Sequence, residues 1–172
     1  SEDVLMEEAG LGLAAAVAAW AIQPDAIVIF AGKGHNAGDA WVAARHWLDA
    51  GWPVVALPCF PVAEWRPLTV EKWRLVADRV SSEIPAAGRL LLVDGLLGLG
   101  SGCGLRAPVV DACRQLNALR LARHAAVVAV DGPTGLDFDT GEADVDAVRA
   151  DLTATVAVAK RGLLAEAAVN HV

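Results

Sequence analysis

A chain of 172 residues is long enough for one domain with a substantial core, and its net charge of −7 argues against nucleic acid or an anionic membrane as the main partner. Hydrophobic residues make up 55% of the sequence and the mean hydropathy is +0.43, yet the longest apolar segment, residues 11–22, is too short to cross a bilayer. The three cysteines, Cys59, Cys103 and Cys113, lack metal-ligand spacing, which favours free thiols in a reducing cytoplasm. We therefore expect one cytoplasmic domain over residues 1–172.

The chain begins with a predicted helix over residues 2–21. Acidic residues occupy its first turn, and an apolar face runs along it. From Leu13 to Trp20 the pattern is apolar nearly all round, which predicts burial on more than one side. We expect this helix to pack against the sheet and against a second subunit in a homodimer.

The next segment, residues 27–39, has the pattern of a strand, a phosphate-sized loop and a helix start. Gly32 and Gly34 allow a close backbone approach, and the N-terminus of the following helix directs free N–H groups towards an anion. A simpler interpretation makes Asn36 only a helix N-cap and Asp39 only a first-turn acid. This stretch alone does not separate the two interpretations.

Strands and helices alternate along the rest of the chain. A loop with five glycines follows one strand at 95–104, and Pro108 marks the start of the helix after it. Trp65 and Trp73 are expected to pack together. This alternation predicts an α/β fold, a Rossmann-like three-layer αβα sandwich with a mostly parallel central sheet. The predicted strands are 54–57, 90–94, 126–131 and 150–158, and the predicted helices are 68–80 and 109–121.

Four oxygen-bearing side chains fall just past predicted strand ends. Because parallel strands share one carboxyl edge, these side chains should converge on a single crevice. Amide, hydroxyl and carboxylate oxygens suit a hard cation, and the set is too poor in carboxylates for a magnesium or calcium cage. A monovalent cation fits better. The four residues are Asn36, Asp94, Asp131 and Thr134.

A nicotinamide-dependent dehydrogenase is the obvious competitor, because residues 32–37 match the dinucleotide-binding fingerprint after a strand. That fingerprint expects an acidic residue at the end of the second strand, where it would hold the ribose hydroxyls. The second strand here ends in Leu57, Pro58 and Cys59. The sequence therefore argues against dinucleotide binding in the usual oxidoreductase manner.

Four motifs, at residues 5–10, 32–39, 93–100 and 130–137, together resemble the YjeF N-terminal domain family, the NAD(P)HX epimerases. The resemblance implies an isomerase that interconverts the R and S forms of hydrated NADH and NADPH in nucleotide repair. It also implies a functional partner, an NAD(P)HX dehydratase. Members frequently continue into such a dehydratase domain, so the chain is compatible with being a fragment of a bifunctional protein.

The resemblance also implies roles for particular residues. Asp131 would touch the substrate and transfer the proton, while Asn36, Asp94 and Thr134 would hold a potassium ion. The substrate would be lined by two loops and Asp131: His35, Asn36, Ala37, Gly38 and Asp39 from the first loop, and Gly98, Leu99, Gly100, Ser101, Gly102, Cys103 and Gly104 from the second.

The sequence departs from the family pattern at three positions. His35 replaces an Asn, Ala37 replaces a Gly, and Thr134 stands where Ser is usual but keeps the hydroxyl. His35 either donates a hydrogen bond to the ligand or crowds the pocket. These changes leave open a second interpretation, a non-catalytic nucleotide- or protein-binding module of the same fold.

Overall fold

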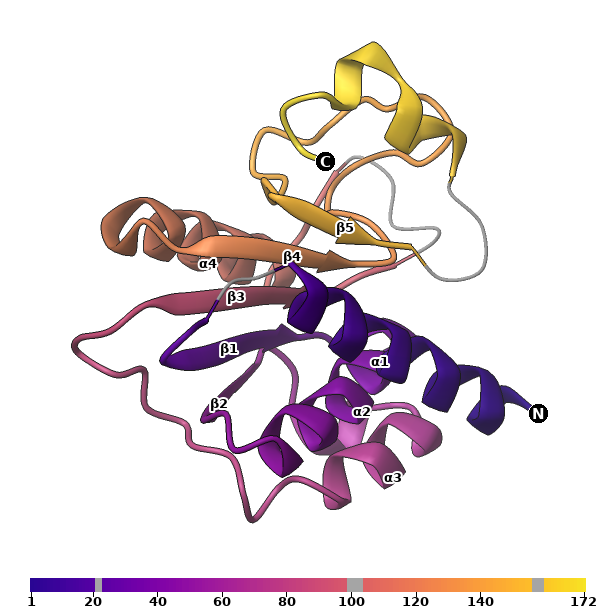
Figure 1. The fold of residues 1–172 in the computed structure, drawn as a ribbon. Coiled ribbons are helices and arrows are strands. Elements are labelled where there is room, and N and C mark those ends of the chain that lie inside the picture. Colours follow the sequence, from indigo (N-terminus) through magenta and orange to yellow (C-terminus); the bar gives the residue numbers. More distant parts are fainter. Residues whose placement is uncertain (21–22, 99–103, 156–159) are drawn as a thin grey trace.

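A five-stranded, all-parallel sheet forms the centre of the molecule in a computed structural model that describes residues 1–20, 23–98, 104–155 and 160–172 (Figure 1). The strand order is β2-β1-β3-β4-β5. Each strand reaches the next through a crossover, so all the strands point the same way and their carboxyl ends share one edge. The strands are β1 (Ala26–Ala31), β2 (Val54–Pro58), β3 (Leu90–Gly95), β4 (Ala126–Val130) and β5 (Leu152–Ala154).

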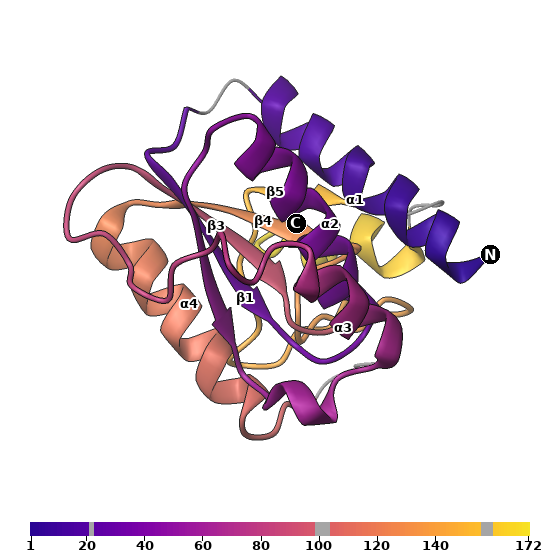
Figure 2. The ribbon, with the colours of Figure 1, turned by 90° about the horizontal axis from the view of Figure 1, so that it is seen from below.

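Helices cover both faces of this sheet, as the sequence predicted. Figure 2 shows α1, α2 and α3 on one side of the sheet and α4 on the other. Short 3-10 turns, Val62–Glu64, Arg161–Leu164 and Glu166–Ala168, complete the described structure. The helices are α1 (Glu2–Ala19), α2 (His35–Asp49), α3 (Pro67–Arg74) and α4 (Val109–Arg123).

The core divides into two layers because alternate residues of a strand point to opposite faces. In β1, Ile27 and Ile29 pack with α1 and α2, whereas Val28 and Phe30 pack on the α4 side. All six residues of β1 are buried, as in a parallel strand covered on both faces. The Rossmann-like prediction is confirmed.

Two predicted elements are shorter in the structure than expected. The helix expected over 68–80 is α3, which ends at Arg74; Val76 and Arg79 then donate to carbonyls three residues earlier, in turns that lead the chain back to the β2 edge at Ser81. The last strand, expected over 150–158, is β5 at 152–154. Just before β5, the Asp151 amide donates to the Val127 carbonyl and the Asp151 carboxylate accepts from the Val127 amide, so this side chain takes the place of one bond of the strand pairing. Residues 156–159 lie outside the described residues.

The predicted tryptophan pair is confirmed and is part of a cluster of three. The ring centroids of Trp65 and Trp73 are 5.7 Å apart, and Trp41 of α2 lies 5.9 Å from the first and 4.8 Å from the second. Such aromatic contacts add to the burial of area. They attach α3 to α2, and so fix the position of the helix that begins at the first glycine loop.

Helix α1 lies against α2, and ion pairs join its first turns to α3. A Cβ atom at Gly10 would lie 2.3 Å from the Cβ of Val42, so the close approach of the two helices requires glycine there. The Lys72 ammonium, whose side chain is 7% exposed, pairs with Asp3 and lies 2.7 Å from Glu7. In the described ranges, no helix combines the length and the apolar character needed to span a membrane.

Candidate functional site

The turn after β1 packs directly on the turn after β3. The Gly32 amide donates to the Gly95 carbonyl at 3.0 Å. A Cβ atom at Gly32 would lie 1.9 Å from the Leu96 carbonyl oxygen, a distance that no side chain allows. The first glycine of the loop is therefore needed for two strand ends to meet.

Asn36 ties three strand ends together. Its side-chain amide Nδ2 donates to the Leu97 carbonyl at 2.9 Å and to the Val130 carbonyl at 2.6 Å. The N-cap of α2 is Gly34, so the interpretation of Asn36 as only an N-cap was wrong. Since Leu97 follows β3 and Val130 ends β4, one amide fixes the common edge of the sheet.

Asp94 and Thr134 form a buried pair at that edge. The Asp94 carboxylate is fully buried and accepts from the Thr134 amide and the Thr134 hydroxyl, each at 2.7 Å, and from the Leu96 amide at 3.2 Å. Burial raises the pKa of Asp94 to about 6, against the opposing effect of these hydrogen bonds. The Thr134 hydroxyl also accepts from the Leu97 amide at 3.1 Å. Leu97 therefore contacts both Thr134, through its amide, and Asn36, through its carbonyl.

Asp131 follows β4 and has a left-handed backbone, with φ of 65°. This conformation is uncommon for residues other than glycine and often marks functional sites. The Asp131 carboxylate, 8% exposed, is ion-paired with the Lys160 ammonium. Lys160 is not among the site residues predicted from the sequence. The one feature of the sequence that could have indicated it is its position just after the last predicted strand.

Asp39 of α2 lies within electrostatic reach of Asp131. Burial, and to a smaller extent the charge of Asp131, raise the pKa of Asp39 to about 7. The site therefore holds an ion-paired carboxylate beside a carboxyl that gains and loses its proton near neutral pH. Two carboxyl groups of this kind, Asp131 and Asp39, can between them accept and donate a proton.

The other predicted site residues have varied surroundings. The His35 imidazole, 42% exposed, lies 2.8 Å from a Glu2 carboxylate oxygen, while Ala37 is fully buried in the core. Gly38 packs against the Met6 side chain, and the Gly104 amide donates to Asp144 at 3.0 Å. Gly98 lies against Asn36. The remaining predicted substrate-lining residues, Leu99, Gly100, Ser101, Gly102 and Cys103, lie outside the described residues.

Gly98→Ala is expected to lower the free energy of unfolding by about 1–3 kcal/mol, because a Cβ at Gly98 would lie 2.3 Å from Asn36 Oδ1 and displace the two hydrogen bonds that the Asn36 amide donates. Thermal denaturation measures the effect. Gly12→Ala is the control, since a Cβ there meets nothing within 4 Å, and better helix propensity should stabilise that variant slightly. Equal melting temperatures for Gly98→Ala and the parent would contradict the assigned role of Asn36.

Comparisons with known proteins find one family by sequence and a similar fold among solved structures. A family model described as "YjeF-related protein N-terminus" matches residues 2–162. An NAD(P)H-hydrate epimerase of Rhodopirellula baltica is 36% identical over 92% of this chain and 67% of its own length. A bifunctional NAD(P)H-hydrate repair enzyme of Leishmania infantum is 36% identical over 84% of this chain, but the match spans only 27% of that enzyme. The crystal structure of the yeast protein YNL200c superposes with a TM-score of 0.74 at 20% identity, over 93% of this chain and 72% of that one.

Proposed function

This chain belongs to the YjeF-related N-terminal family, and we propose that it is an isomerase that interconverts the R and S epimers of hydrated NADH and NADPH. The similarity to the Rhodopirellula epimerase over nearly the whole chain supports this activity. The observation that carries the proposal is the convergence of Asp131, Lys160 and Asp39 at the carboxyl edge of the sheet.

The chemistry asked of these residues is proton transfer at one hydroxyl group. The substrate carries a hydroxyl and a ring nitrogen on the same carbon, and that carbon loses its configuration by ring opening or by loss and return of water. Either route needs a base that takes up a proton and an acid that supplies one. We assign the base to Asp131, which is ion-paired with Lys160, and the acid to Asp39, whose pKa of about 7 leaves it partly protonated at neutral pH.

We also propose that Asn36, Asp94 and Thr134 hold a potassium ion. The donor set fits: an amide, a carboxylate and a hydroxyl lie beside the carbonyls of Leu97 and Val130. In the described part of the chain, the buried Asp94 carboxylate has no ion-pair partner, so a cation would offset its burial. When bound, the ion would supply positive charge that holds the three strand ends in place.

Potassium is expected to raise the melting temperature by about 3 °C relative to choline chloride at equal ionic strength, since a ligand that binds only the folded state stabilises it. Differential scanning calorimetry at pH 8 measures this shift. Thr134→Val should remove it by deleting the hydroxyl ligand. The potassium assignment fails if the parent melts at the same temperature in both salts.

The activity assay uses a dehydratase that consumes only the S epimer. In a mixture of both epimers, the dehydratase removes the S epimer, and the R epimer is consumed only after its conversion to S. Adding the chain should therefore speed the consumption of the R epimer. This test also separates the proposal from a non-catalytic binding module, which would bind nucleotide without accelerating consumption. The surroundings of the altered residues do not favour the module: the His35 ring contacts Glu2 and Arg66, and Ala37 belongs to the core.

The dehydratase is also the expected partner protein. The chain spans about a quarter of the length of the Leishmania relatives, which are named bifunctional NAD(P)H-hydrate repair enzymes. A homodimer and a cytoplasmic setting remain part of the proposal. Exposed Val4, Leu5 and Leu11 on α1 support the first, and the free thiols of Cys59 and Cys113 support the second.

A further inference from the structure

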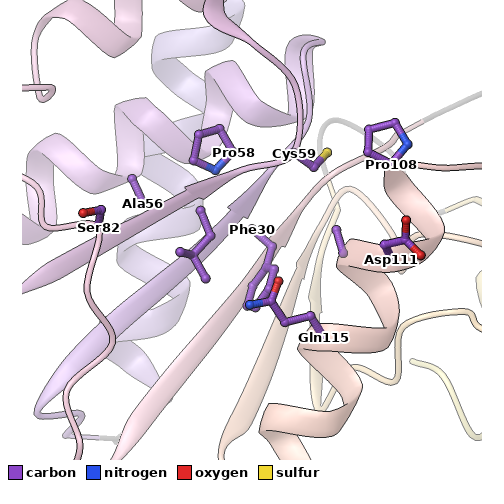
Figure 3. Close-up of a pocket in the computed structure, with 10 residues that line it drawn as sticks. Phe30, Ala56, Pro58, Cys59, Ser82, Pro108, Asp111 and Gln115 are labelled. Carbon is purple, nitrogen blue, oxygen red and sulfur yellow. The ribbon is translucent and has the colours of Figure 1, made fainter.

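A pocket of about 440 Å³ lies beyond the carboxyl end of β2, on the face of the sheet that α4 covers (Figure 3). Its volume lies in the range of small-molecule sites. Figure 3 shows Phe30 at the sheet, Pro58 and Cys59 at the end of β2, and Asp111 and Gln115 on α4. The lining combines apolar walls with a few polar groups, as sites for heterocyclic ligands do.

This pocket opens beside the candidate site. Phe30 is the register partner of Asp94 in the parallel pair of β1 and β3, so the two side chains point to the same face. Burial raises the pKa of the Cys59 thiol to about 11, the charge of Asp94 acts in the same direction and the charge of Lys33 opposes it, so both charges lie within electrostatic reach of the pocket wall. The pocket and the proposed cation ligands are therefore neighbours.

The strand order sets the distance from the pocket to Asp131. From β4, which Asp131 follows, to β2 there are three strand spacings of about 4.8 Å, or about 14 Å in all. An extended dinucleotide bridges such a distance. Dinucleotides cross sheets of this kind at the point where the strand order reverses, which here lies between β1 and β3.

The dinucleotide-binding fingerprint expects an acidic residue at the end of the second strand, and β2 has none there. An acidic residue of α4 lines the pocket instead. Asp111, in the first turn of α4, has a side chain that is 67% exposed and lines the pocket beside Cys59. The Arg114 guanidinium lies 4.0 Å from the Asp111 carboxylate and donates two hydrogen bonds to Asp146, at 3.0 and 2.7 Å.

Among the described lining residues there is no lysine or arginine. The charge of Lys33 reaches the Cys59 thiol, but the Lys33 ammonium is paired with Glu64 at 3.1 Å. The lining itself thus offers an acceptor for sugar hydroxyls and no lysine or arginine for a phosphate.

We propose that this pocket binds the adenosine end of the hydrated dinucleotide, with Asp111 accepting hydrogen bonds from the ribose hydroxyls, and that it disfavours a 2′-phosphate there. The inference rests on the proposed function, because it takes the dinucleotide as the substrate. It adds a preference for hydrated NADH over hydrated NADPH.

The test measures the binding of AMP and of adenosine 2′,5′-bisphosphate by calorimetry. The parent chain is expected to bind AMP about tenfold more tightly, because a second phosphate would face Asp111 with like charge at a partly exposed position. In Asp111→Asn the two affinities should differ by no more than about twofold, since the repulsion is gone while the side-chain shape is kept. Asp78→Asn is the matched control, an exposed aspartate beyond α3, and should keep the parental ratio.

The outcomes separate this inference from the proposed function. Equal affinity of the parent for both nucleotides, absence of AMP binding, or an unchanged ratio in Asp111→Asn would each overturn the adenosine pocket even if the chain epimerises hydrated NADH. Discrimination that depends on Asp111 in a chain without epimerase activity would support the pocket and remove the proposed reaction.

Discussion

Asp131→Asn is expected to slow epimerisation by about 10² to 10⁴-fold, the usual contribution of a general acid–base group. The amide keeps the size of the carboxylate but cannot take up the proton, and it removes the ion pair with Lys160. The coupled assay with the S-specific dehydratase measures the rate at which the R epimer is consumed, after subtraction of spontaneous epimerisation.

The exposed Asp139 provides the control, because Asp139→Asn makes the same chemical change on the same loop away from the ion pair. This variant should retain the parental rate. Melting curves of both variants show whether a slower reaction comes from unfolding. A folded Asp131→Asn protein that epimerises at the parental rate would rule out Asp131 as the base.

Asp39→Asn is expected to make the protein more stable and less active at the same time. The folded-state pKa of Asp39, about 7, lies above its ordinary value of 3.8, so the folded state binds this proton more tightly than the unfolded state. The free energy of unfolding therefore falls as the pH rises from about 4 to about 7. Removing the buried charge should add about 2 kcal/mol at pH 8, or about 4–8 °C in melting temperature, and the gain should shrink at pH 5.

The activity of the same variant tests the assigned acid. If protonated Asp39 donates, the parental kcat/KM should decline as the pH rises through about 7, and Asp39→Asn should lower the rate and lose that inflection. Asp139→Asn, on the surface, should change neither the melting temperature nor the pH profile. A stabilised Asp39→Asn protein with a parental pH profile would leave Asp39 as a buried structural acid without a part in proton transfer.

Much of the fold was predictable because its signals are local. Continuous apolar runs gave the buried strands β1 and β3, and the glycine turn after β1 predicted the start of α2 within a residue or two. The end of α3 was not predictable, because residues 75–79 keep a helical apolar pattern while the chain turns back towards Ser81. A tertiary requirement outweighs local propensity there.

Part of the candidate site was also predictable, because the positions of strand ends can be read from the sequence. The expected convergence of Asn36, Asp94, Asp131 and Thr134 followed from parallel strands that share an edge. Hydrogen bonds at Leu97 and Asp94 bring three of them together, Asn36, Asp94 and Thr134. The pairing of Lys160 with Asp131, and the placing of Asp111 beside the end of β2, depend on how distant elements pack. No spacing rule along the chain contains that information.

The backbone of Asp131 depends on the least protected strand of the sheet. Its amide donates to the Ala154 carbonyl of β5 at 2.8 Å, and β5 is a three-residue strand at the rim. Peripheral strands of this length detach at a fraction of the cost of global denaturation. Heat should thus disconnect the proton-transfer residues while the rest of the domain is still folded, so inactivation is expected to precede melting.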